Sequence, residues 1–272
     1  MERVACFTLD LEADYAGVPP YESYDSLDHT EAFENLIREH GIKLTTFVTG
    51  YILDKNFPIL ERLKKIGSRF ETHTYSHPLR VPPEDKIKDI QNGIAAYERY
   101  FGEKPRGYRA PQGIISSAEV KFLADEGIHY SSSVFPSYLP GRYKNLHLPT
   151  APFRYRDIGL LEIPMSVVPY IRLPITASHI NLLTFEFYRW MMASLGLPTL
   201  INVCMHLYDF VNIPAYHTLP LKEKCGYLRT QLMRRKTAEL ERLARHLCGH
   251  GYEFAYLSDV AVELWARLAR KS

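Results

Sequence analysis

Residues 70–79 read FETHTYSHPL and place two histidines, His73 and His77, four positions apart directly behind a short strand-like run. Residues four apart share one face of an α-helix, which is how one large class of zinc proteases presents its ligands. Pro78 argues against a helix here because it disfavours helical geometry at His77, and residues 70–72 have the character of a strand end. We therefore expect a strand that ends in a loop, so that any metal bound by the two histidines would be bound from that loop.

Strand-like and helix-like stretches alternate in this way from one end of the chain to the other. Predicted strands fall at residues 4–9, 43–48, 69–72, 107–109, 129–132, 159–163, 200–205 and 252–256. Predicted helices fall at residues 30–40, 56–66, 83–101, 117–126, 185–194 and 221–247, with a last helix ending near residue 269. Residues 135–173 are rich in proline and tyrosine, and we expect loops and a hairpin there. Such alternation is typical of parallel strands covered by helices.

A closed barrel and an open doubly wound sheet both fit this alternation, and the positions of the polar residues favour the barrel. Asp10 and Glu12 follow the first predicted strand, Arg109 a middle one and His206 a later one. A barrel gathers the carboxyl ends of its strands at one mouth, where residues far apart in the sequence converge. Because no linker, repeat or low-complexity run interrupts the pattern, we predict a single α/β barrel domain over residues 1–272.

Composition and charge exclude several classes of protein. The chain of 272 residues is 46% hydrophobic and 24% charged with a formal net charge of +2, which is ordinary for a globular protein and gives no bulk attraction to nucleic acid. No uncharged apolar run reaches about 18 residues, so we predict no transmembrane span. The first residues run directly into a predicted strand without the pattern of a signal peptide, and we expect a cytoplasmic protein. The cysteines lack metal or redox spacing and are expected to be reduced packing residues: Cys6, Cys204, Cys225 and Cys248.

The polar residues expected at the barrel mouth suit metal-assisted hydrolysis. One carboxylate from Asp10 or Glu12, together with the two imidazoles of the opening stretch, is a common set of ligands for a divalent ion that keeps open positions. Such an ion makes a bound water nucleophilic near neutral pH and polarises a carbonyl oxygen. The second carboxylate can take the proton of the water, and Arg109 can keep that carboxylate ionised and oriented. His206, at the end of an apolar strand, is placed to donate a proton to a leaving amine.

In chain order, these residues resemble the motifs of the polysaccharide deacetylase family, which is carbohydrate esterase family 4 and is built around the nodulation-factor deacetylase homology domain. The matching stretches are Thr8-Leu9-Asp10-Leu11-Glu12, His73-Thr74-Tyr75-Ser76-His77, Arg109-Ala110-Pro111-Gln112-Gly113 and Met205-His206. The resemblance spans roughly residues 4–210. It implies a distorted TIM-like (β/α) barrel with about seven strands, in agreement with the alternation described above.

The resemblance also implies a role for each matching residue. Asp10 would be the catalytic base and Arg109 would tether it, the backbone N–H of Gln112 would help to bind the oxyanion, and His206 would be the general acid. The implied metal ligands are Glu12, His73 and His77. The implied cofactor is a divalent metal ion, with zinc expected first and cobalt or nickel as alternatives.

Two positions depart from the family pattern. Glu12 stands where aspartate is usual, and its longer side chain leaves Asp14 as an alternative metal ligand, although we expect Asp14 to be a solvated loop acid. Ser131 stands where many members carry an aspartate that supports the catalytic histidine. A different support for His206 would be needed, and Asp209 is the candidate.

These observations lead us to expect a metal-dependent hydrolase that removes an N-acyl group, with acetyl as the first choice, from an amino sugar or glycan, including a nucleotide-linked or lipid-linked one. A deformylase of a lipid-linked amino sugar and a catalytically silent carbohydrate-binding relative are the alternatives. The predicted helix at residues 221–247 is strongly basic. We interpret it as a solvated face, with a patch for an anionic substrate or a membrane surface as the alternative.

Overall fold

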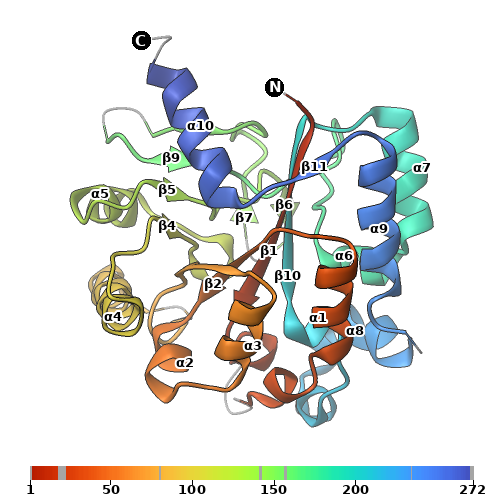
Figure 1. Cartoon of the computed structure of the whole chain (residues 1–272), viewed down its shortest axis with the longest axis horizontal. Helices are drawn as coiled ribbons and strands as arrows, with labels where there is room; N and C mark the ends of the chain where they lie inside the picture. Colours follow the sequence, from red (N-terminus) through yellow and green to blue (C-terminus); the bar gives the residue numbers. More distant parts are fainter. Residues whose placement is uncertain are drawn as a thin grey trace.

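The computed structural model of the protein describes residues 2–17, 23–79, 81–140, 143–155, 158–233 and 235–269. Within this part of the chain, seven parallel strands pair in the order β9-β5-β4-β3-β2-β1-β10 and curl into the wall of a barrel (Figure 1). The predicted barrel of about seven strands is thereby confirmed. Their bounds are β1 (Val4–Leu11), β2 (Leu44–Val48), β3 (Arg69–Thr72), β4 (Gly107–Tyr108), β5 (Tyr130–Ser131), β9 (Leu161–Glu162) and β10 (Leu200–His206).

The two edges of this strand order approach each other without a regular ladder. The backbone N–H of Ser166, in the segment after β9, donates to the carbonyl of Asn202 on β10 at 3.0 Å. The Asn202 side chain donates to the carbonyls of Ile163 and Pro164 at 3.3 and 3.2 Å. Two short strands extend the sheet: β8 (Phe153–Arg154) pairs antiparallel with β9, and β11 (Glu253–Phe254) pairs parallel with β1. The sheet is therefore a curled, incompletely closed barrel.

Alternation along β1 explains how one strand serves both the core and the barrel interior. Phe7, Leu9 and Leu11 belong to the main hydrophobic core, which also contains residues of α1 and α9. Cys6 and Asp10 lie on the opposite face of the strand because successive side chains point to opposite sides of a sheet. The interior face therefore brings Asp10 to the mouth of the barrel.

Helices cover the outer face of the sheet, and several are punctuated as their sequences predict. Helix α5 begins at a capping box in which the Ser116 hydroxyl accepts from the backbone N–H of Glu119. Helix α4 begins at Pro83 and ends before Gly102, which takes the left-handed conformation. The bounds are α1 (Glu31–Glu39), α2 (Gly50–Lys55), α3 (Ile59–Lys65), α4 (Pro83–Phe101), α5 (Ser117–Asp125), α6 (Ala177–Leu183), α7 (Phe185–Leu195), α8 (Leu221–Leu232), α9 (Ala238–Gly249) and α10 (Leu257–Ala269).

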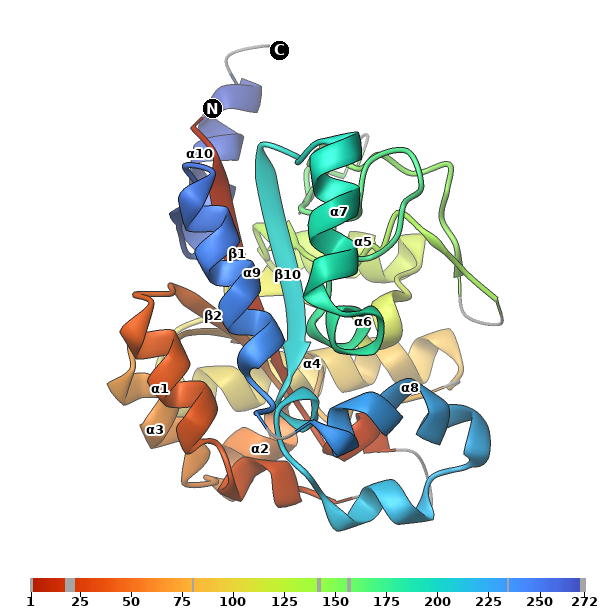
Figure 2. The same ribbon diagram turned by 90° about the vertical axis from the view of Figure 1, so that its right-hand side faces the viewer.

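The predicted continuous helix at residues 221–247 is wrong. The chain leaves helical geometry at Met233, and two separate helices, α8 and α9, both contact α6 but otherwise pack against different neighbours (Figure 2). Helix α9 buries Leu240, Leu243 and Leu247 in the main core beside β1, whereas α8 packs on α6 and the turn at Pro214–Thr218. No proline marks the break between the two helices, and the apolar periodicity of the sequence does not indicate it either. The hairpin expected within residues 135–173 is present as β6 (Tyr138–Leu139) paired with β7 (Tyr143–Lys144).

About half of the positive charge on this basic segment is paired with carboxylates of the same chain, for the most part at the surface. Four arginines of α8, α9 and the connection between them lie within 4 Å of a carboxylate: Arg229 of Glu239, Arg235 and Arg245 of Glu241, and Arg242 of Glu186. Arg234 lies outside the described residues. Among the described residues, no helix combines the length and the apolar character needed to cross a bilayer.

Candidate active site

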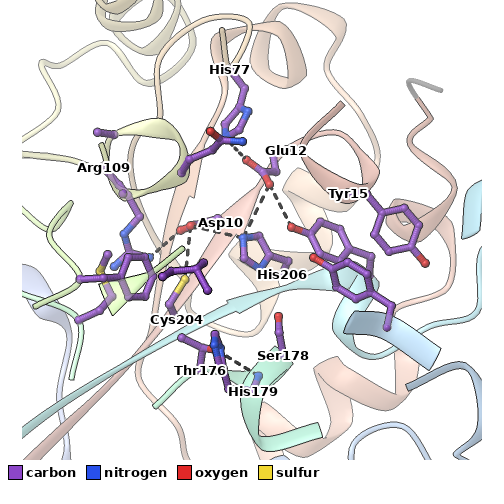
Figure 3. A pocket seen from close by; sticks show the side chains of 18 of the residues that line it. Asp10, Glu12, Tyr15, His77, Arg109, Thr176, Ser178, His179, Cys204 and His206 are labelled. Carbon is purple, nitrogen blue, oxygen red and sulfur yellow. Dashed lines mark hydrogen bonds and ion pairs between the residues drawn. The ribbon is translucent and has the colours of Figure 1, made fainter. Parts of the chain in front are cut away.

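The first and last predicted motifs come together because β1 and β10 are neighbouring parallel strands. Their register sets Asp10 beside His206. The same register, continued through β2, β3 and β4, brings the ends of all these strands to one side of the sheet. Side chains that are far apart in the sequence therefore surround one cavity of about 370 Å³ (Figure 3).

The histidine pair lies in a loop after β3, as the sequence predicted. Thr74 and His77 both take positive φ angles, 63° and 57°, so no helical turn joins the two histidines. Asp89 of α4 fixes the loop by accepting bonds from the backbone N–H groups of Tyr75 and Ser76 at 2.9 and 3.1 Å. Helix α4 can come this close because Gly93 faces the loop: a Cβ there would lie 2.5 Å from the carbonyl carbon of Thr74.

Glu12 and the two histidines form a set of ligand atoms that suits a divalent metal ion. Glu12 Oε2 lies 2.7 Å from His77 Nε2 and 3.1 Å from His73 Nε2, and all three side chains are buried. The ring of His73 is oriented from behind, since its Nδ1 donates to the backbone carbonyl of Arg109 at 2.8 Å. This fixes the ring so that Nε2 faces Glu12, the orientation found in histidines that bind metals. Burial alone would raise the pKa of Glu12, but the imidazoles of His77 and His73 hold that pKa well below its ordinary value.

Asp14, the alternative ligand, points elsewhere. Its carboxylate accepts a 2.5 Å hydrogen bond from the Ser23 hydroxyl and longer ones from the backbone N–H of Ser26. Among the described residues, the group of potential metal ligands at this position contains Glu12 and not Asp14. The expectation that Asp14 is a solvated acid is also wrong, because Asp14 is fully buried and burial raises its pKa.

Asp10 stands next to this set and is held by Arg109. Arg109 Nη1 donates to Asp10 Oδ1 at 2.6 Å, and the guanidinium is itself held by Nε and Nη2 donating to the carbonyl and hydroxyl of Ser132 at 2.7 and 2.9 Å. The guanidinium also stacks on the Phe47 ring, with its carbon 4.1 Å from the ring centroid. Although burial opposes the charge, Asp10 raises the pKa of Arg109. The pair is therefore a buried, charge-assisted contact with a fixed geometry.

His206 is supported by Asp209, the residue that the sequence offered as a replacement for the missing aspartate. His206 Nδ1 lies 3.5 Å from Asp209 Oδ2, and that oxygen also accepts from the His206 backbone N–H at 2.9 Å. The Ser178 hydroxyl donates to the other oxygen of Asp209 at 2.6 Å. Burial lowers the pKa of His206, but Asp209, Glu12 and Asp10 outweigh burial and raise it to about 9.

Ser131 takes part in a different network from the one an aspartate would form here. Its hydroxyl lies 2.8 Å from the Ser133 hydroxyl, which in turn accepts from the backbone N–H of Ala110. Buried Glu162 completes the network by accepting from the backbone N–H groups of Ser133 and Val134, both at 2.8 Å. These contacts stabilise the turn that follows Arg109. In that turn, Gln112 lines the cavity with a positive φ of 55°.

Two further residues beside the last motif line the cavity, and sequence reasoning missed the first of them, Cys204. Cys204, expected to be a packing residue, lines the cavity with its Sγ 3.5 Å from Asp10 Oδ2. The period of two along β10 could have indicated it, since Cys204 shares the face of His206. Tyr208 donates from its hydroxyl to Glu12 Oε1 at 3.2 Å and stacks on the His206 ring, with ring centroids 4.7 Å apart. The opposite wall of the cavity is apolar, with Phe135, Leu139 and Met165 among its residues.

Comparison with known proteins relates part of this chain to one family. The polysaccharide deacetylase family model matches residues 21–131. An uncharacterised protein of Streptomyces coelicolor is 28% identical over 106 residues, and the peptidoglycan-N-acetylglucosamine deacetylase of Bacillus cereus is 25% identical over 108 residues. These alignments cover 38% and 39% of this chain and 43% and 39% of the relatives, so the chain spans about two fifths of the length of either relative.

Solved structures extend the likeness in fold to nearly the whole chain. The crystal structure of a candidate polysaccharide deacetylase from Mycobacterium smegmatis superposes with a TM-score of 0.64 at 20% identity, covering 98% of this chain and 91% of that one. At this identity the likeness establishes the fold alone. The family model over residues 21–131 and the fold over the rest together confirm that this chain resembles the polysaccharide deacetylases, the family that its four sequence motifs predicted.

Proposed function

We propose that the protein is a metal-dependent hydrolase that removes an N-acyl group, with acetyl as the first candidate, from an amino sugar or glycan. The observation that carries this proposal is the juxtaposition in one cavity of two differently held carboxylates. Glu12 Oε2 faces two imidazole nitrogens within 3.1 Å, whereas Asp10 is held by the Arg109 guanidinium at 2.6 Å. One carboxylate is thus placed to ligate and the other to accept a proton.

Each polar residue has a distinct part in the proposed reaction. A divalent ion held by Glu12, His73 and His77 would supply Lewis acidity, lowering the pKa of water and polarising the amide carbonyl. Asp10 accepts the proton of the attacking water, and Arg109 holds the Asp10 carboxylate in position through its 2.6 Å hydrogen bond. His206 then donates a proton to the nitrogen that leaves as the amine, and the raised pKa of His206 keeps it protonated near neutral pH.

The remaining walls of the cavity support a substrate with both a ring and an apolar portion. Tyr15, Tyr208 and Tyr227 lie together on one side, with ring centroids 4.7 to 5.7 Å apart, and aromatic faces of this kind stack on sugar rings. Leu139 and Leu182 line the cavity elsewhere, and Leu182 is 41% exposed. This favours a glycan, or a sugar linked to an apolar carrier, over a small polar amide.

The test is hydrolysis by the purified chain loaded with zinc, cobalt or nickel, measured as acetate and formate released from N-acetylated and N-formylated glucosamine oligosaccharides. Acetate release would support the deacetylase, and release of formate alone would support the deformylase. Asp10→Asn should lower the rate by about 10²- to 10⁴-fold. The variant should bind the metal ion of the Glu12 set as tightly as the parent chain, because Asp10 is outside that ligand set.

The alternative hypothesis, a catalytically silent carbohydrate-binding relative, predicts the opposite result. Such a protein would bind the same oligosaccharides with and without Asp10→Asn and would release no acid in either form. A cytoplasmic location and a nucleotide-linked or lipid-linked substrate remain predictions from the sequence. Fractionation of the native protein, with detection in the soluble, membrane and exported fractions, would test the location.

A further inference from the structure

A second group of potential metal ligands lies in the same cavity, on the side of Asp10 that Arg109 does not use. Asp10 Oδ1 accepts from Arg109, whereas Asp10 Oδ2 faces Cys204 Sγ at 3.5 Å and His206 Nε2 at 3.7 Å (Figure 3). The three ligand atoms lie within 4.8 Å of one another. A carboxylate oxygen, a thiol sulfur and an imidazole nitrogen therefore converge on one point beside the Glu12 set.

The separations of these atoms match the coordination distances of a small tetrahedral ion. With bonds of about 2.3 Å to sulfur and about 2.0 Å to oxygen and nitrogen, tetrahedral angles set sulfur and oxygen about 3.5 Å apart and oxygen and nitrogen about 3.3 Å apart. The observed separations are 3.5 Å and 3.7 Å. Side-chain adjustment of a few tenths of an ångström would complete the site.

Glu12 provides a fourth ligand and a link to the first site. Its Oε2 faces His73 and His77, while its Oε1 lies 3.7 Å from His206 Nε2. A carboxylate with one oxygen on each side can bridge two ions. The surroundings of Asp10 and Glu12 are thus suited to two neighbouring cations rather than one.

We propose that Asp10, Cys204 and His206 form a second, weaker site for a thiophilic divalent cation such as Zn²⁺ or Cd²⁺, and that filling it inhibits the hydrolase. The site is reachable because its three residues line the cavity and the His206 side chain is 21% exposed. Binding replaces the thiol proton of Cys204 and the imidazolium proton of His206, which both pass to solvent, with a metal–sulfur and a metal–nitrogen bond. The ion then occupies both the proposed base and the proposed acid, so neither can transfer a proton.

Charge and ligand type set the affinity and the selectivity of this site. Arg109, 2.6 Å from the other oxygen of Asp10, and the ion held by Glu12 both repel a second cation, so this ion binds more weakly than the first. The thiolate selects Zn²⁺ and Cd²⁺ over Mg²⁺, which takes oxygen ligands. Only the inhibition rests on the proposed function, because the binding can be measured without any turnover.

The experiment is a cadmium titration of the full chain carrying Cys225→Ser and Cys248→Ser, which remove the two exposed thiols. The ultraviolet charge-transfer band of a cadmium–thiolate bond reports binding through sulfur. We expect two equivalents per chain, with the band accompanying the second only. In the same background, Cys204→Ser should keep the first equivalent and lose the band, and Cys204→Ala serves equally if the serine variant does not fold.

Inhibition of the hydrolytic activity by metal ions is the second measurement. Excess zinc or cadmium should inhibit the parent, excess magnesium should not, and Cys204→Ser should raise the inhibitory concentration by about tenfold or more. A single equivalent in the parent, or a thiolate band that survives both Cys204 substitutions, would overturn the proposal. If no preparation hydrolyses any substrate, the proposed function fails, while the second equivalent and its band still decide whether the site exists.

Discussion

Glu12 and Glu71 are both buried glutamates inside the same barrel, yet their surroundings have opposite effects. Glu12 lies at the mouth, where His73 and His77 hold its pKa well below the ordinary value. Glu71 lies two residues before His73 on β3 and thus on the same face of the strand, one layer deeper. Its carboxylate accepts from the backbone N–H groups of Gly107 and Arg106 at 2.6 and 2.9 Å and from the Tyr130 hydroxyl at 3.0 Å. Burial nevertheless raises the pKa of Glu71 to about 7.

The comparison teaches that burial of an acid does not by itself identify a site. Neutral donors, such as the backbone N–H groups around Glu71, satisfy a carboxyl group without compensating for the lost hydration of its charge. The imidazoles that face Glu12 favour its ionised form through positive charge and hydrogen bonding, and their ring nitrogens are placed to act as ligands at the same point. A functional carboxylate is therefore distinguished here by the type of its neighbours and by its place at the strand ends.

The largest expected effect comes from making the same substitution at both positions. Glu12→Gln should weaken zinc binding by more than about 100-fold, because a neutral amide replaces the anionic ligand between the two imidazoles. Glu71→Gln should leave zinc affinity within about twofold, since Glu71 lies outside the ligand set. Competition with a chromogenic chelator would measure both affinities. Equal losses would mean that Glu12 is a structural acid like Glu71.

An intermediate effect is expected on the pH dependence of stability. The pKa of Glu71 is about 7 in the folded chain against 4.5 ordinarily, so its contribution to the free energy of unfolding is fully present below pH 4.5 and is lost as the pH rises through 7. The loss amounts to about 3 kcal/mol. Glu71→Gln should remove this dependence, because its amide can still accept from the two N–H groups and contact Tyr130. Urea denaturation of the metal-free parent and Glu71→Gln proteins between pH 4.5 and 8.5 would measure this dependence. If the free energies of unfolding of the two proteins changed with pH in the same way, the prediction would be wrong.

A smaller effect is expected at His206. Because His206 is the proposed proton donor, activity should fall as the pH rises through its pKa of about 9. Asp209→Asn removes one of the carboxylates that raise this pKa, so the alkaline limb of the rate profile should move down by about one pH unit, with little change near pH 6. Ser178→Ala is the matched control, since it removes a contact of Asp209 but leaves the charge. An alkaline limb that stays in place would remove His206 from the role of acid.

Local sequence signals were sufficient for much of the barrel. The bounds of β3 and α4 agree with the prediction residue for residue, because apolar periodicity and the proline and glycine at the ends of α4 are written in neighbouring residues. The break between α8 and α9 escaped prediction since it depends on where each half packs. Helices α2 and α6 were also missed, and both are short.

The site was predictable to a similar degree. Residues on the motifs converge as expected. The burial of Asp14, by contrast, depends on hydrogen bonds from Ser23 and Ser26, and no sequence pattern indicates that these residues lie beside it. Cys204 was overlooked because it lies in an apolar strand, where a cysteine is expected to pack in the core and not to face a polar cavity. The sequence therefore did not indicate which residues from distant parts of the chain surround each site residue.

Arg109 holds the proposed base with its side chain and a proposed metal ligand with its backbone: Nη1 donates to Asp10 while the carbonyl oxygen accepts from His73 Nδ1. One residue is therefore the common reference for two reacting partners that come from different strands. If β4 shifts by a fraction of an ångström, the base and the imidazole move in concert, and the distance between proton acceptor and nucleophile is conserved. Because a single residue holds both Asp10 and His73, their relative position can survive small distortions of the barrel. Two groups held by separate residues would move apart under the same distortions.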